Sequence, residues 1–186
     1  MLTPSDFRKG LRIEVDGKPY EVIDYVHTKP GKGGALYRTR IKSLIDGHVL
    51  ERTFKAGEPI PPADIDERPM QFIYKEGNDY VFMDLETYEQ ISLSADQLGR
   101  AVDFLTENLE VTVLYFKGEP LGVELPNFVV MKVVHTEPGV RGDTVSGGGT
   151  KPATVETGAV IQVPLFVEVG DRIRVDTRSG KYVERA

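Results

Sequence analysis

The sequence predicts an all-β protein made of several small β-barrels. Short runs rich in β-branched and aromatic residues recur along its 186 residues, with glycine, proline and asparagine between them. Only one segment, Ser94–Leu109, has the apolar repeat of a helix, and Ser94 and Gln97 form a capping box at its start. Many short strands with few helices are typical of barrels rather than of an α/β sheet.

The first third of the chain predicts a β-hairpin in a small SH3-like barrel. Tyr20–Lys29 and Ala35–Ile45 are the two predicted strands, the glycine-rich segment 30–34 joins them, and His48–Phe54 closes the barrel. Side chains alternate between the faces of a strand. One face is therefore expected to carry the three cations of the second strand: Arg38, Arg40 and Lys42. The other is expected to carry Tyr37, Thr39 and Ile41.

The proline-rich segment Glu58–Pro62 predicts a stiff linker, because proline fixes φ and removes hydrogen-bond donors. Strands are expected after it at 70–74, 80–85 and 111–116, and then at 128–134, 159–163, 172–176 and 181–184. A long loop with several glycines, 137–152, interrupts the last group. The expected domains are therefore 1–64, 65–127 and 128–186.

Charge divides the chain in the same way. The first segment carries 11 Lys/Arg and 9 Asp/Glu, the second 4 and 13, and the third 8 and 7, within a net charge of −6. An acidic middle thus separates two mildly basic ends. Between Asp24 and Asp46 there is no acid, whereas five cations fall in that stretch: Lys29, Lys32, Arg38, Arg40 and Lys42. A solvated strand face explains such a run, but the absence of acids favours contact with a polyanion.

The sharpest local motif is Pro30-Gly31-Lys32-Gly33-Gly34, at the expected hairpin tip. Glycine on both sides lets the backbone reverse tightly and approach another surface, which leaves Lys32 as the functional side chain. An ordinary turn with an exposed lysine is the alternative. The required glycine spacing and the Ser/Thr after the lysine are missing, so a phosphate-binding Walker loop is excluded.

The glycine-rich loop is a second candidate, because mobile backbone N–H groups can approach phosphates or base edges. A disordered connector explains it equally well. Catalytic motifs are missing from the sequence, and the three histidines lack metal-ligand spacing. We therefore expect no enzyme, no metal and no cofactor. The sequence also lacks cysteine, a signal-peptide core and an apolar run long enough to span a membrane, which fits a cytoplasmic protein.

The C-terminal stretch 151–185, the segment 138–144 before it, the tip motif 29–35 and the central segment 82–90 resemble bacterial elongation factor P in the right order along the whole chain. The resemblance implies a KOW-type SH3-like barrel followed by two OB folds, arranged in an L shape similar to a tRNA. It also implies a factor that binds the 70S ribosome between the P and E sites, stabilises the P-site peptidyl-tRNA and promotes peptide-bond formation at stalled proline runs.

The resemblance also assigns site residues. Lys32 matches the position that many members modify, which implies a lysine-modifying enzyme. The loop is expected near the E-site codon through Gly142, Asp143, Thr144, Gly147, Gly148, Gly149, Thr150 and Lys151. Tyr182 and Arg185 belong to the ribosome-facing C-terminal signature. Ribosomal proteins are expected partners, and the chain is expected to be a monomer.

Two other functions stay open at this point. A general RNA-binding OB/SH3 protein would bind free single-stranded RNA with a steep salt dependence. An enzyme with the glycine-rich loop as a lid would depend on a carboxylate such as Asp143 rather than on Lys32.

Overall fold

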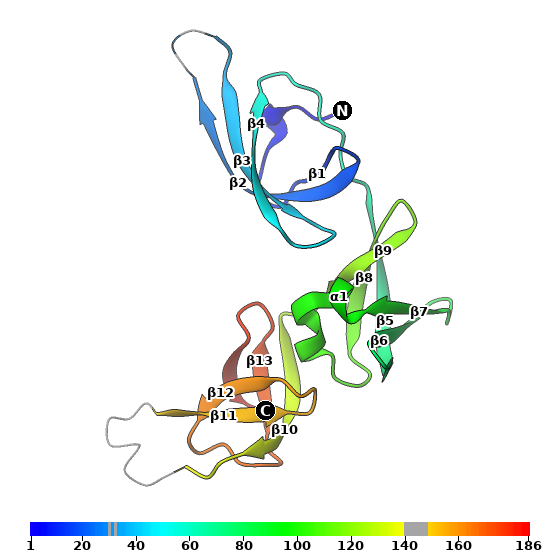
Figure 1. Ribbon diagram of the computed structural model, residues 1–186, viewed down its shortest axis with the longest axis vertical. Coiled ribbons are helices and arrows are strands. Elements are labelled where there is room, and N and C mark those ends of the chain that lie inside the picture. The colour runs from blue at the N-terminus through cyan, green and yellow to red at the C-terminus, as the bar shows by residue number, and fades with distance from the viewer. Residues whose placement is uncertain (30, 32, 140–148) are drawn as a thin grey trace. The chain divides into compact units, whose positions relative to one another are not determined.

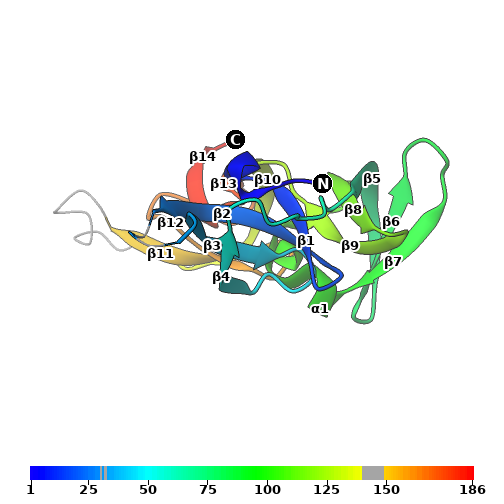
Figure 2. The ribbon, with the colours of Figure 1, turned by 90° about the horizontal axis from the view of Figure 1, so that it is seen from above.

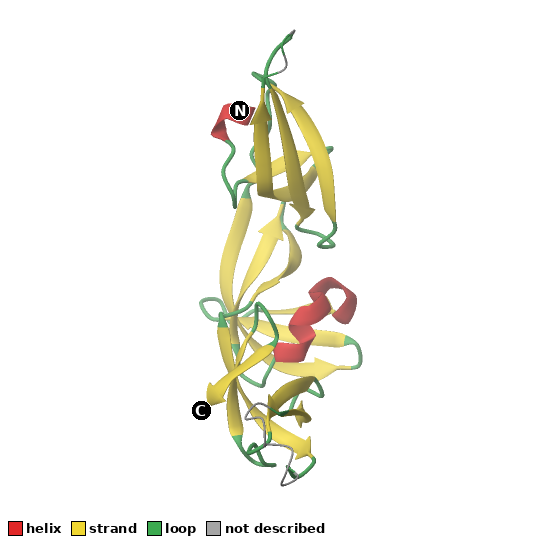
Figure 3. Ribbon diagram, turned by 90° about the vertical axis from the view of Figure 1, so that its left-hand side faces the viewer, coloured by secondary structure: helices red, strands yellow, loops and turns green. Residues whose placement is uncertain are grey.

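The computed structural model describes residues 1–29, 31, 33–139 and 149–186. Most of them lie in strands that form three antiparallel sheets, and helices are few (Figures 1 and 3). The prediction of an all-β protein is confirmed. The chain forms two compact units, one of residues 1–68 and 113–122 and the other of residues 69–112 and 123–186. The domain boundaries 1–64, 65–127 and 128–186 stay a prediction.

The first sheet has the order β1-β2-β3-β4, with β1 at Arg12–Val15, β2 at Lys18–Thr28, β3 at Leu36–Ser43 and β4 at Val49–Lys55. A short 3₁₀ helix, η1 (Pro4–Asp6), precedes it. Its core consists of apolar side chains from these strands and from the segments that flank them: Phe7, Leu11, Ile13, Val15, Val22, Ile41, Phe54 and Ile60. Burial of this cluster is the main force that holds the barrel together.

The second sheet has the order β7-β6-β5-β8-β9. Its strands are β5 (Ile65–Glu76), β6 (Asp79–Asp84), β7 (Gln90–Ser94), β8 (Glu110–Phe116) and β9 (Glu119–Glu124). Phe72 packs between Tyr80 and Phe82, with ring centroids 5.6 Å away in each case. The strands expected at 70–74 and 80–85 are confirmed as parts of β5 and β6, which pair as an antiparallel hairpin with Glu76 opposite Asp79.

The predicted helix Ser94–Leu109 is wrong in its length. The capping box is confirmed, since Gln97 N donates to Ser94 Oγ at 3.2 Å, but α1 ends at Leu98. Gly99 then adopts φ 56° and ψ −130°, a conformation that an α-helix cannot continue through. A 3₁₀ helix, η2 (Gly99–Phe104), follows. The break redirects the chain so that Phe104 is buried.

The third sheet has the order β12-β11-β10-β13-β14. Its strands are β10 (Phe128–Thr136), β11 (Thr150–Val155), β12 (Val160–Pro164), β13 (Arg172–Asp176) and β14 (Lys181–Arg185). Phe104 lies in the same core cluster as Met131, Val155 and Ile173. Thr157 Oγ1 also donates to the Asp103 carbonyl at 2.7 Å. The segment before Leu105 therefore completes the core of this last sheet.

Four strands were missed from sequence: β1, β7, β9 and β11. The expected loop 137–152 ends earlier, because β11 begins at Thr150. Over the described part of the chain, none of the helices is both long and apolar enough to pass through a membrane.

Candidate nucleic-acid interface

The β2–β3 hairpin extends beyond the core of the first barrel. Every residue from Asp24 to Lys29 is exposed, although the pairing of β2 with β3 continues to Thr28 and Leu36. Figures 1 and 2 show β2 and β3 running side by side. The rings of His27 and Tyr37 stack across the two strands with centroids 4.3 Å apart and an interplanar angle of 7°. This stack supports the hairpin where it leaves the core.

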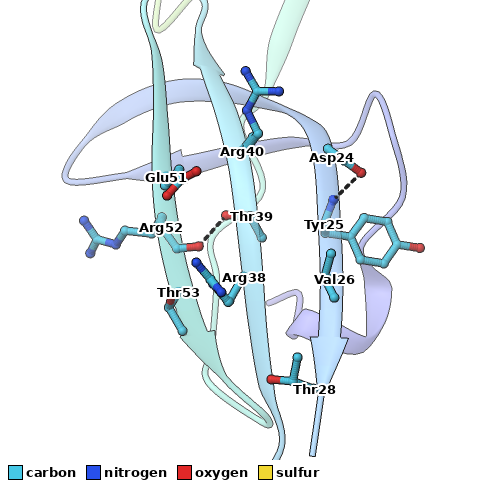
Figure 4. Close-up of a pocket in the computed structure, with 10 residues that line it drawn as sticks. All are labelled: Asp24, Tyr25, Val26, Thr28, Arg38, Thr39, Arg40, Glu51, Arg52 and Thr53. Carbon is cyan, nitrogen blue, oxygen red and sulfur yellow. Dashed lines mark hydrogen bonds between the residues drawn. The ribbon is translucent and has the colours of Figure 1, made fainter.

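The alternation predicted for β3 is confirmed. Thr39 and Ile41 are 3% and 0% exposed, whereas Arg38, Arg40 and Lys42 are exposed. The Thr39 hydroxyl donates to the Arg52 carbonyl at 2.7 Å, which ties β3 to β4 from the inner side (Figure 4). A row of cations therefore runs along the outer face of the hairpin.

The strand register shows what faces each cation. Arg40 lies opposite Asp24 on β2 and opposite Glu51 on β4. The Cβ atoms of directly opposite residues on one face lie about 5 Å apart, so these two carboxylates reduce the local positive potential at Arg40 although neither forms an ion pair with it. Lys42 likewise lies opposite Glu21. The acid-free stretch of sequence is thus not an acid-free surface.

Arg38 is placed differently. Its neighbours in register are Val26 on β2 and Thr53 on β4, which are both uncharged. Arg38 forms no ion pair with any described residue, and the same holds for Arg40 and Lys42. The positive charge of this face therefore increases towards the hairpin tip.

Two more lysines extend the basic surface towards the tip. Lys55 pairs with Leu36, which also faces Thr28, so it lies one step beyond Arg38 on the same face. It is exposed, as is Lys29 after the end of β2. Lys55 was missed from sequence because only the β3–β4 register brings it here.

A groove of ≈ 480 Å³ crosses the three strands beside this row (Figure 4). Arg38, Arg40 and Arg52 line it together with Asp24, Glu51 and uncharged residues. The groove is open and mixed in charge, which suits contact with a large polyanion at its edge rather than enclosure of a small anion.

At the tip, Pro30 and Lys32 lie outside the described residues. Gly31, Gly33 and Gly34 are exposed, and a Cβ atom added at any of them would meet nothing within 4 Å. Gly33 has φ 113°, a region that favours glycine. The glycines on either side of Lys32 thus provide open space, and their role as tip support stays a prediction.

The glycine-rich loop lies largely outside the described residues, including Gly142, Asp143, Thr144, Gly147 and Gly148. Gly149 and Thr150 are described, and the Thr150 hydroxyl lies 3.4 Å from Gln162 Oε1. Lys151 differs from the other candidates because it is only 7% exposed. Its ammonium donates to the Glu137 carbonyl, which joins the two ends of the loop. A buried lysine held in this way serves the fold, so we leave it out of the proposed RNA-contacting surface.

The two C-terminal candidates lie on β14. Tyr182 is half-buried and packs against the core of the third sheet. The Arg185 guanidinium lies 5.0 Å from the centroid of the Phe166 ring, and its Nη1 is 3.8 Å from Asp171 Oδ2. Arg185 is exposed and available to a partner, whereas Tyr182 presents only part of its ring.

Asp176 and Asp46, both among the described residues, have a pKa below the ordinary value. Hydrogen bonds from Arg178, first from its side chain, lower the pKa of Asp176, and the same pair raises the pKa of Arg178. The backbone N–H of His48 lowers the pKa of Asp46 in the β3–β4 turn. Neither carboxylate lies in a cavity beside a base or nucleophile, and clusters able to hold a metal are missing from the described part of the chain. These carboxylates stabilise turns.

Comparison with known proteins identifies the family. Three family models match consecutive parts of the chain: "Elongation factor P (EF-P) KOW-like domain" at residues 3–60, "Elongation factor P (EF-P) OB domain" at 65–123 and "Elongation factor P, C-terminal" at 129–185. The elongation factors P of Synechococcus sp. (strain JA-3-3Ab) and Pelotomaculum thermopropionicum are 56% and 54% identical over 185 residues, each covering 100% of both chains.

A solved structure shows the same kind of fold. A eukaryotic translation initiation factor 5A from Methanococcus jannaschii has a TM-score of 0.56 and 25% identity, over 67% of this chain and 91% of its own. The matching models confirm the KOW-like barrel and the OB fold that follows it. The chain therefore belongs to the elongation factor P family, and it is a translation elongation factor and not an enzyme.

Proposed function

We propose that this factor binds the ribosome between the P and E sites, where its β2–β3 hairpin points Lys32 towards the peptidyl-transferase centre. The observation that carries the proposal is the charge gradient of the hairpin. Its cations face Asp24, Glu51 and Glu21 in register near the barrel, whereas Arg38 faces only uncharged residues in register. Such a hairpin is attracted to RNA mainly through its outer end.

The proposed mechanism is positioning. Holding the acceptor end of the P-site peptidyl-tRNA restricts the reactants to productive geometries, which lowers the entropic part of the barrier. Lys32 would supply a cation on a flexible stem, and a modification that lengthens it would reach further along the phosphates. The remaining chemistry of peptide-bond formation belongs to the ribosome. Slow steps such as consecutive prolines gain most from this help.

The proposal brings further partners with it. It includes the 70S ribosome, its P-site peptidyl-tRNA, ribosomal proteins near the acidic central segment, and an enzyme that modifies Lys32. It also includes a monomeric factor in the cytoplasm, with its three domains in the L-shaped arrangement that the family resemblance implies. Arg185 and the loop around Gly142–Thr144 would then contact the ribosome at the other end of the chain.

The test is a toeprint of ribosomes stalled at a proline run, with and without the natively expressed factor, whose intact mass is measured in parallel. We expect relief of the stall by the native protein and a strong loss of relief for Lys32→Ala. Lys75→Ala is the matched control, because Lys75 is an exposed lysine of β5 outside the hairpin. Failure of the factor to relieve the stall, with or without a mass shift at Lys32, would overturn the proposal.

A general RNA-binding protein remains the competing function, and the same material distinguishes it. The ribosomal function predicts weak binding to free RNA, since the net charge is −6. Tight binding to free RNA together with unchanged toeprints would favour the competing function.

A further inference from the structure

A second basic surface lies on the third sheet, which belongs to a different unit of the chain from the hairpin. We define the β10 face as the outward side of β10, β13 and β14. Its exposed side chains on β10 include Phe128, Val130 and Lys132, which alternate with the buried Val129 and Met131. The register places Phe128 opposite Asp176, Val130 opposite Arg174 and Lys132 opposite Arg172.

Cations outnumber acids on this face once the ion pairs are counted. The carboxylate of Asp176 is paired with Arg178 at 2.9 Å, and that of Glu184 is paired with Arg174 at 2.7 Å. Arg172 and Lys181 lie on the same face and have no ion pair within the described structure. The paired acids cannot offset them, so the face keeps a local positive charge in a chain that is acidic overall.

Glu156 is a further acid close to this face. Its carboxylate accepts a hydrogen bond from the backbone N–H of Lys132 at 2.9 Å, which fixes it at the β11 side. Arg100 adds a cation at the opposite side. A Cβ atom built on Gly180, in the turn before β14, would lie 3.3 Å from Arg100 Nη2. The positive charge is therefore greatest around the turn from β13 to β14.

An aromatic ring lies at this most positive end. Phe128 is 47% exposed, and the Arg178 guanidinium lies 5.5 Å from its ring centroid. Two hydrogen bonds from Arg178 to Asp176, from Nε at 3.1 Å and from Nη2 at 2.9 Å, hold the guanidinium in place. The planar ring and the planar guanidinium are thus held side by side at the surface before any ligand binds. An exposed ring beside a fixed guanidinium suits a planar ligand that carries negative charge.

We propose that the β10 face binds single-stranded RNA, with a base stacked at Phe128 and phosphates held by Arg172 and Lys181. Charge complementarity selects a polyanion, and the exposed ring selects one with unstacked bases over a duplex. An acidic protein would use the cations but would gain little from the ring. The surface is separate from the β2–β3 hairpin, and it does not depend on Lys32 or on the hairpin's proposed role.

The test is fluorescence anisotropy of the full-length chain with a labelled single-stranded RNA at low ionic strength. We expect Phe128→Leu to weaken binding about tenfold, because loss of one base–ring stack typically costs that much. Tyr74→Leu is the matched control. Tyr74 is also an aromatic residue with 47% exposure, but it lies on β5 outside the β10 face. This control is expected to bind as the wild type does.

A salt titration tests the phosphate contacts. Arg172→Gln/Lys181→Gln should reduce the slope of log K against log salt by about 1.4, since each phosphate contact with a single strand contributes about 0.7. Equal binding by Phe128→Leu and the wild type would overturn the proposal. So would displacement of the RNA by polyglutamate as readily as by unlabelled RNA, because this outcome would identify an acidic protein as the ligand.

Discussion

Arg38 and Arg40 are close neighbours on one strand face, yet glutamine substitutions at the two positions should have opposite effects. Arg40 faces two carboxylates in register. Neither carboxylate forms an ion pair with Arg40, so only a weak charge interaction is lost, and Arg40→Gln should cost about 0.5–1 kcal/mol of stability. Arg38 faces only uncharged side chains, and Arg38→Gln should change stability by less than about 0.5 kcal/mol.

The effect on function should be reversed. An unopposed guanidinium contributes more to RNA attraction than one that is already offset by acids. Arg38→Gln should therefore weaken ribosome binding and reduce its salt dependence by about one phosphate contact, about 0.9 in the slope of log K. Arg40→Gln should leave binding closer to that of the wild type.

Two assays measure the pair. Thermal unfolding shows the stability difference, because about 1 kcal/mol shifts the midpoint by roughly 4–8 °C in a domain of this size. Ribosome co-sedimentation over a salt series shows the binding difference. If both variants lost affinity equally while both kept their stability, the assignment of Asp24 and Glu51 as partners of Arg40 would be wrong, and the charge gradient with it.

Three further predictions concern the second unit. Phe104→Ala should lower the free energy of unfolding, measured in urea, by about 3–5 kcal/mol, because the ring is 2% exposed in the core of the third sheet. Phe104→Leu should lower it less. A small effect of the alanine substitution would contradict the core assignment. Lys151→Met should lower the free energy of unfolding by about 1–3 kcal/mol, because it leaves a loop carbonyl without its donor. Lys75→Met, at an exposed site, should leave this free energy unchanged. Equal effects of the two substitutions would contradict the structural role of Lys151. The lowered pKa of Asp176 stabilises the folded state above the pKa that this group has in the unfolded chain, and this stability is lost as pH falls through the folded pKa. Asp176→Asn should therefore be less stable than the wild type at neutral pH and equally stable in acid. A constant difference in stability across pH would exclude the Arg178 pair as the cause.

The sequence was most informative where structure is local. Alternation along β3 followed from a two-residue period, and the capping box at Ser94 followed from a three-residue spacing. The helix length failed because Leu105 and Leu109 continue an apolar stripe, although Gly99 breaks the backbone and Phe104 turns to a distant core. Tertiary packing overrides a local pattern in such cases.

The site shows the same division. The row of cations on β3 was predictable, but Glu21 and Glu51 come to it only through strand register, which depends on non-local pairing. Lys151 was assigned to the ribosome-facing loop through the family resemblance, which carries no information on burial. Its burial depends on how β10 and β11 pair, with Thr136 opposite Ala153.

The position of Phe104 has a consequence for how this protein can be divided. A C-terminal fragment that begins at Phe128 would keep all five strands of its sheet and lose the phenyl ring at their centre. A cavity of that size costs about 3–5 kcal/mol, out of the roughly 5–15 kcal/mol that keeps a typical domain folded. Such a fragment would be poorly suited to fusion or crystallisation because of its low stability, whereas a fragment that starts before β5 keeps Phe104 in its core.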